Sequence, residues 1–156
     1  MPMLVRALPL LLLAMRLSAW DELSADQLKM LQDPGGWEYI TVTDADSGIQ
    51  TQHTCFDGQP HPDQCSGTLT LHSDNAFVKN IHIHGQSVAR HGQYKLDGRE
   101  ITFFDEFGTS DGPYALDLNT QGKTMSLQIA QTAGVLVRAD FELEKEYKKR
   151  LQDQKH

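Results

Sequence analysis

The chain has 156 residues and carries 21 acidic against 14 basic side chains, a formal net charge of −7 at pH 7. An acidic balance repels phosphate backbones, and the sequence has no basic stripe interleaved with aromatic residues, so we expect no nucleic-acid binding. A chain of this length suits a single domain built around one core.

Residues 1–19 have the composition of a secretory signal peptide. Arg6 is followed by an apolar run over residues 7–15, and Leu17-Ser18-Ala19 offers a cleavage site. The run is shorter than the about 20 apolar residues that span a bilayer, and the absence of a cysteine near the cut argues against a lipid anchor. Cleavage would remove two arginines and no acid, leaving 12 basic against 21 acidic residues and a net charge of −9. We therefore expect a secreted or periplasmic protein without a transmembrane segment.

Residues 20–36 are predicted to form a short helix and a linker. Ser24 is suited to the N-cap, and Gln27, three residues later, completes a capping box. Pro34 and the two glycines after it end the helix, because proline disfavours helix at the residue before it.

Residues 37–143 alternate between apolar and polar side chains, which is the pattern of half-buried strands. The alternation is clearest over residues 135–143, where odd positions are apolar and Arg138 and Asp140 fall on the other face. The same period recurs at Leu69/Leu71, Phe77/Ile81/Ile83, Tyr94/Leu96, Ile101/Phe103, Tyr114/Leu116/Leu118 and Met125/Leu127/Ile129. Turn-forming clusters separate these stretches, among them residues 44–48 and 108–112. The pattern predicts a mainly β fold, an antiparallel up-and-down β-barrel of about eight strands, since closure hides strand edges; a β-sandwich is the alternative.

Cys55 and Cys65 are the only cysteines, and the segment between them is rich in turn formers. In an exported protein two cysteines most often pair, so a disulfide is expected here. A redox pair or metal thiolates are the rival interpretations; redox pairs usually have two intervening residues, and metal sites need more ligands.

Residues 144–156 are predicted to form a charged C-terminal helix and tail. Tyr147 and Leu151 lie four residues apart and form a narrow apolar stripe. We expect this stripe to dock on the barrel wall.

The order of helix, Gly35-Gly36-Trp37, cysteine loop, strands and terminal helix resembles the lipocalin or calycin superfamily. The segment 92–98, Gly-Gln-Tyr-Lys-Leu-Asp-Gly, is similar to a hairpin of small bacterial lipocalin-like domains. The resemblance implies that Gly35 and Trp37 enter the first strand at the closed end of the barrel. It also implies that Arg138 covers Trp37, and that the barrel binds a small hydrophobic molecule.

Seven aromatic residues are candidates to point into the barrel lumen and contact a ligand. They are Trp37, Tyr39, Phe77, Tyr94, Phe103, Tyr114 and Phe141. Large aromatics also fill small barrels, so the alternative is a filled barrel that works as an interaction or structural module of the cell envelope. An exposed patch at Phe104 and Phe107 is the expected contact in that case, with the protein partner left open.

His82 and His84 alternate with isoleucines and are predicted to share a strand face, with His91 across the hairpin. Such histidines could hold Zn²⁺ or Cu²⁺; the alternative is a polar outer face. No other cofactor is expected. The sequence contains no nucleophile elbow and no His-Glu-x-x-His motif, and the acids of residues 105–111 are expected to be solvated, so we predict that the protein is not an enzyme.

Overall fold

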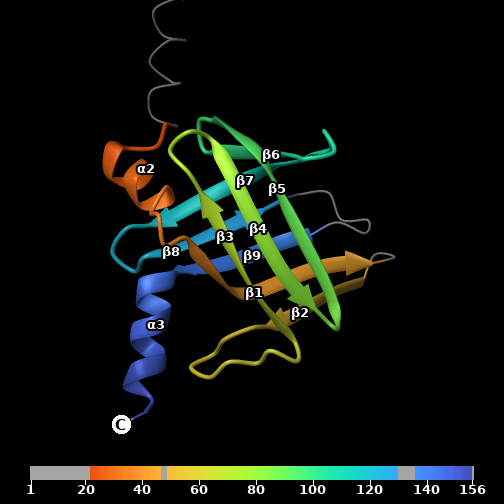
Figure 1. Ribbon diagram of the computed structural model, residues 1–156, viewed down its shortest axis with the longest axis vertical. Helices are drawn as coiled ribbons and strands as arrows, with labels where there is room; N and C mark the ends of the chain where they lie inside the picture. The colour runs from red at the N-terminus through yellow and green to blue at the C-terminus, as the bar shows by residue number, and fades with distance from the viewer. Residues whose placement is uncertain (1–21, 47–48, 130–135, 156) are drawn as a thin grey trace, which may run out of the picture.

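The computed structural model describes residues 22–46, 49–129 and 136–155, within which it has two helices and nine strands (Figure 1). The helices are α2 (Ala25–Leu31) and α3 (Glu144–Asp153). The strands are β1 (Trp37–Asp46), β2 (Ile49–Thr54), β3 (Cys65–Leu71), β4 (Ala76–Ile83), β5 (Gln86–Asp97), β6 (Glu100–Asp105), β7 (Ser110–Asn119), β8 (Thr124–Gln128) and β9 (Leu136–Leu143).

The strands form one antiparallel sheet that closes into a barrel. Strands β3 to β9 pair in chain order, and β1 pairs with both β3 and β9, which completes an eight-stranded ring. Strand β2 is a ninth member that pairs with β1 over residues 41–46. The mainly β fold and the closed up-and-down barrel predicted from the alternation are therefore confirmed.

One face of each of the eight strands in the ring lines the barrel core. On β9 the inward residues are Val137, Ala139, Phe141 and Leu143, all buried, as the alternation predicts; residue 135 of that pattern lies outside the described residues. Each fully buried large apolar side chain contributes about 1.5–3 kcal/mol relative to exposure. Because side chains alternate along a strand, a shift in strand pairing by one residue would expose this whole set, so the core also fixes the register.

Helix α2 closes one end of the barrel (Figure 1). The predicted capping box is present, since the Ser24 hydroxyl accepts from the Gln27 amide and the Gln27 side chain accepts from the Ser24 amide. Leu31 is buried in the core, and the Trp37 indole Nε1 donates to its carbonyl oxygen at 3.0 Å. The Trp37 ring therefore packs beneath α2 at this end, as expected. We call the opposite end, where the β4–β5 and β6–β7 hairpins lie, the mouth.

The second helix docks on the outside of the barrel through the cysteine loop. Cys55 and Cys65 form the expected disulfide, and both residues are buried. The neighbouring Phe56 ring lies 4.8 Å from the Tyr147 ring of α3, centroid to centroid, and 4.6 Å from the Arg150 guanidinium carbon. Tyr147 therefore docks against the cysteine loop, whereas the sequence predicted docking on the barrel wall.

Two details of the sequence analysis are wrong. Arg138 does not cover Trp37: it lies on the outer face of β9, bonded to Asp140, because even-numbered positions of this strand face outward. The predicted turn over residues 108–112 is in part strand, since β7 begins at Ser110.

The predicted signal peptide lies outside the described residues. No helix within the described ranges is long and apolar enough to cross a membrane.

Gly92 is required where β5 and β6 approach closely. A Cβ atom at this position would lie 2.0 Å from the carbonyl oxygen of Phe104. Gly92→Ala is therefore expected to lower the free energy of unfolding by about 2 kcal/mol, measured by urea denaturation. Gly108→Ala is the control, because its Cβ would meet nothing within 4 Å, although its φ of 78° also favours glycine. Equal losses in the two variants would contradict the steric explanation.

Candidate functional site

The half of the barrel next to α2 is filled by its own side chains. All seven aromatic residues predicted to point inward do so and are buried in the core. Ring centroids lie 4.4 Å apart for Tyr39 and Phe141, 5.0 Å for Phe77 and Phe103, and 6.0 Å for Phe103 and Tyr114. These rings contact one another, so their part in contacting a ligand stays a prediction.

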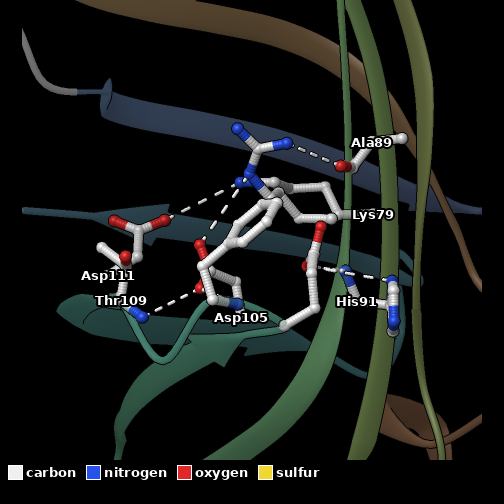
Figure 2. A network of polar contacts seen from close by, with 9 residues as sticks. Lys79, Ala89, His91, Asp105, Thr109 and Asp111 are labelled. Carbon is white, nitrogen blue, oxygen red and sulfur yellow. Dashed lines mark hydrogen bonds and ion pairs between the residues drawn. The ribbon is translucent and has the colours of Figure 1, made fainter.

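The half next to the mouth carries charged residues on the inner face. Lys79 stands between Phe77 and Ile81 in the inward series of β4 and is opposite Arg90 on β5. Asp105 at the end of β6 and Asp111 near the start of β7 face these two cations. We call Lys79, Arg90, Asp105 and Asp111 the mouth cluster (Figure 2). It combines two basic and two acidic side chains from four strands. Lys79, Arg90 and Asp105 stand at positions where alternation would place core residues, whereas Asp111 comes opposite Phe103 through an irregularity in the pairing of β6 with β7.

Lys79 and Asp111 form one arm of the mouth cluster. Figure 2 shows the Lys79 side chain reaching from β4 toward Asp111, and the Nζ–Oδ2 distance is 3.7 Å. The other carboxylate oxygen of Asp111 accepts a hydrogen bond from the Tyr114 hydroxyl at 2.5 Å. Burial raises the pKa of Tyr114 and of Tyr39, and the Asp111 charge raises both further. Both phenols therefore stay protonated and face a carboxylate.

Arg90 and Asp105 form the other arm. The Arg90 Nε atom lies 3.8 Å from Asp105 Oδ2, while Asp105 Oδ1 accepts from the backbone amides of Phe107 and Thr109, each at 2.9 Å (Figure 2). Asp105 thus shapes the β6–β7 loop. That loop holds the Phe107 ring 5.6 Å from the Arg90 guanidinium carbon, and the ring remains 74% exposed. The loop therefore places an exposed aromatic ring beside a cation at the mouth.

The mouth cluster is accessible to solvent. The exposed fractions of the side chains are 20% for Lys79, 41% for Arg90 and 38% for Asp111, against 16% for Asp105. Part of each cation is therefore in contact with solvent, while the aromatic side chains of the core are buried.

The structure does not bring the predicted metal ligands together. His82 faces outward, and its Nδ1 lies 2.9 Å from the Ser87 hydroxyl. His84 follows the end of β4 with a φ of 49°, and its ring meets the His53 ring edge to face, with the centroids 4.5 Å apart. His91 lies beside Glu106 instead. Within the described ranges, no group of three or more His, Cys, Asp or Glu side chains could hold a metal ion. The shared face expected for His82 and His84 is wrong, because the turn interrupts the alternation.

The outer wall carries a depression of about 420 Å³ over β7, β8, β9 and the start of β1, bordered by α3. Its charged groups other than Asp117 already have partners. Arg138 donates to Asp140, Asp140 accepts from the Thr41 hydroxyl, and Arg150 pairs with Glu142. This depression therefore offers fewer free donors to a ligand than the mouth cluster does.

Glu38 makes stability depend on pH near neutrality. Its carboxyl is half-buried beside α3, and burial together with the nearby Glu144 charge raises its pKa from 4.5 to about 7. The folded protein therefore binds this proton more tightly than the unfolded chain does. The resulting stabilisation is complete below pH 4.5 and is lost as the pH rises to about 7.

Glu38→Gln is expected to raise the free energy of unfolding at pH 8 by about 1 kcal/mol, because the variant lacks the half-buried charge. The gain is smaller than the full pKa shift implies, since solvent screens a half-exposed group. At pH 4 the variant and the wild type are expected to be equal. Urea denaturation at pH 4, 6 and 8 measures the difference. Glu100→Gln, on an exposed residue, is the control. A difference that is the same at all three pH values would contradict the assignment.

The fold and the mouth cluster define a closed antiparallel barrel with charged groups at one end of its interior, an architecture consistent with a calycin-like fold. Comparison of the chain with protein-family models, curated proteins and solved structures finds no match.

Proposed function

We propose that the protein binds a small molecule in the half of the barrel next to the mouth. The observation that carries this proposal is the inward placement of Lys79 and Arg90. Both cations remain partly exposed, and their ion pairs with Asp111 and Asp105 are longer than hydrogen bonds, so neither cation is fully engaged by its acidic partner. Charged side chains on the inner face of a barrel, where apolar side chains are expected, are typical of functional sites.

The packed aromatic layer limits the size of the ligand. Because Tyr39, Phe103 and Tyr114 are buried against their neighbours, the proposed ligand would lie on the mouth side of these three side chains. We also propose that the protein works outside the cytoplasm, as a lipocalin-like exported barrel. The Cys55–Cys65 disulfide supports this location, since disulfides persist in oxidising compartments.

The neutral fluorescent probe N-phenyl-1-naphthylamine tests the proposal. We expect its emission to rise on titration with the wild-type protein, with one probe bound per chain. Ile81→Trp, on the inner face of β4, is expected to abolish this binding because the larger ring fills the space above Lys79. The matched control Asn80→Trp places the same ring on the exposed outer face of β4 and should leave binding unchanged. Absence of probe binding to the wild type, or equal binding to both variants, would overturn the proposal.

A second candidate function is binding of a protein partner at the Phe104 and Phe107 rings, which are 40% and 74% exposed. Phe104→Ser tests it separately, because Phe104 lies on the outer face of β6. Loss of a partner with Phe104→Ser, together with unchanged probe binding, would favour this second function.

A further inference from the structure

Strand β2 forms a free edge of the sheet. Strand β1 pairs with β9 along one side, and on its other side it pairs with β3 only through Trp37 and Glu38. Residues 41–46 of β1 pair on that second side with β2 instead (Figure 1). Within the described part of the chain, β2 pairs with no strand other than β1, so its second edge has no partner in the sheet.

One hydrogen bond shows which backbone groups of β2 point to the free edge. The Thr54 amide donates to the Gln64 side-chain Oε1 at 2.9 Å, so this N–H points away from β1. In an antiparallel ladder, successive residues point their N–H and C=O groups alternately toward one neighbouring strand and the other. The N–H and C=O groups of Gln50 and Gln52 therefore also point to the free edge, and the side chains of residues 49–52 are exposed.

The free edge lacks features that keep strands from pairing. Residues 49–54 contain no proline and no Asp, Glu, Lys or Arg, although charged residues and proline are devices by which proteins protect exposed strand edges. Ile49 is 69% exposed. A two-stranded ribbon with exposed side chains is marginal by itself, and further strands stabilise it. These features favour the addition of another strand to β2.

We propose that two copies of the chain pair through β2, in antiparallel orientation, about a two-fold axis at Thr51. A second copy fits because two identical strands in antiparallel orientation are complementary to each other. The distribution of charge also favours pairing at this strand. The chain has a formal net charge of −7, so two copies repel over much of their surfaces, whereas β2 carries no acidic or basic residue.

The free backbone groups determine the register of this pairing. With Thr51 opposite Thr51 of the second copy, Gln50 of each copy lies opposite Gln52 of the other, and each such pair exchanges both of its N–H···O bonds. Pairing centred on Gln52 would instead set Gln50 against Thr54, whose amide is already bonded to Gln64. The axis at Thr51 therefore uses the backbone groups that are free.

The side chains are compatible with this register. Ile49 lies opposite His53 of the second copy in a non-hydrogen-bonded pair, where side chains come close, so the exposed apolar side chain gains a neighbour. On the other face, the side-chain amides of Gln50 and Gln52 can donate to and accept from each other across the two strands. The interface is small, which suits a weak dimer.

Sedimentation equilibrium measures the association. We expect the average mass of the wild type to rise from that of one chain toward that of two as the concentration increases from about 10 µM to about 1 mM, the range for a weak interface. The mass of a single chain at every concentration would overturn the proposal and favour an extended segment of another protein as the occupant of this edge.

Charges placed at the axis test the register. Thr51→Lys and Thr51→Glu each bring two like charges together, so each variant alone is expected to associate about fivefold or more weakly than the wild type. An equimolar mixture of the two places an ammonium opposite a carboxylate and should restore at least the wild-type affinity. The matched controls Thr120→Lys and Thr120→Glu change the same charges on an exposed residue between β7 and β8, and should leave association unchanged.

Gln52→Pro tests the backbone pairing separately. Proline removes an N–H group that would bond to the second copy but none that bonds to β1, so the fold should tolerate it while the dimer is lost. Circular dichroism checks that each variant folds. Association that is unchanged in Thr51→Lys, Thr51→Glu and Gln52→Pro would overturn the proposal. A mixture of the two Thr51 variants that associates no better than either alone would overturn it as well.

Discussion

Trp37→Ala is expected to lower the free energy of unfolding by about 3–5 kcal/mol. Trp37 is the largest of the fully buried side chains, with 0% of its surface exposed, and it lies on β1 opposite Leu69 and Leu143. Its removal leaves a cavity that these rigid strands cannot close. The loss is a large fraction of the about 5–15 kcal/mol that stabilises an ordinary domain.

The variant Trp37→Phe distinguishes the contribution of the buried ring to stability from that of the indole hydrogen bond. Phenylalanine keeps most of the buried volume but leaves the Leu31 carbonyl without its 3.0 Å donor, so a smaller loss of about 1–3 kcal/mol is expected. Both values come from urea denaturation followed by circular dichroism. A loss below about 1 kcal/mol for Trp37→Ala would show that this end of the barrel is not the packed layer described above.

Removal of the disulfide is the second large effect. The double variant Cys55→Ala with Cys65→Ala is expected to lower the free energy of unfolding by about 2.7 kcal/mol, because the bond closes a loop with a sequence separation of 10 residues in the unfolded chain. Alanine avoids adding a hydroxyl at two buried positions. The neighbouring Phe56 carries the contacts to Tyr147 and Arg150, so docking of α3 should loosen as well.

Reduction of the wild type supplies an independent measurement of the same bond. Urea denaturation with and without dithiothreitol should give a loss close to that of the double variant, and amide exchange should speed up in α3 more than in β7. Unchanged denaturation after complete reduction would contradict the stabilising role of the bond.

The alternation of apolar residues predicts the barrel wall well. Successive side chains of a strand point to opposite faces, so a strand with one buried face has an apolar residue at every second position. Phe77, Phe103 and Phe141 all lie on the inner face as their positions in sequence indicate. The capping box at Ser24 and the disulfide were predictable for a similar reason: each depends on chemistry within a few residues.

The candidate site was not found from the sequence, although one signal was present. Lys79 occupies the position between Phe77 and Ile81, which alternation assigns to the interior. From their place in a glycine-bearing segment, Asp105 and Asp111 are expected to be solvated loop acids. Their pairing with Lys79 and Arg90 depends on the register of β4 with β5 and of β6 with β7, which no local pattern specifies.

His84 and Arg138 lie elsewhere than predicted. The prediction for His84 extended the strand alternation past the end of β4, and the prediction for Arg138 came from a resemblance to another family. His84 leaves the alternation because the β4–β5 turn needs a φ of 49° at that residue. Arg138 was assigned to Trp37 through a resemblance, but Trp37 is opposite Leu143, five residues further along β9. Both errors concern tertiary placement, which sequence spacing alone does not determine.

Native mass spectrometry tests the central claim most directly. The wild type, Ile81→Trp and Asn80→Trp would be measured as purified and again after addition of N-phenyl-1-naphthylamine, in native and denaturing modes. We predict one bound molecule per chain in native mode for the wild type and Asn80→Trp, none for Ile81→Trp, and none in denaturing mode. No adduct on the wild type, or the same adduct on all three proteins, would contradict a ligand site at the mouth of the barrel.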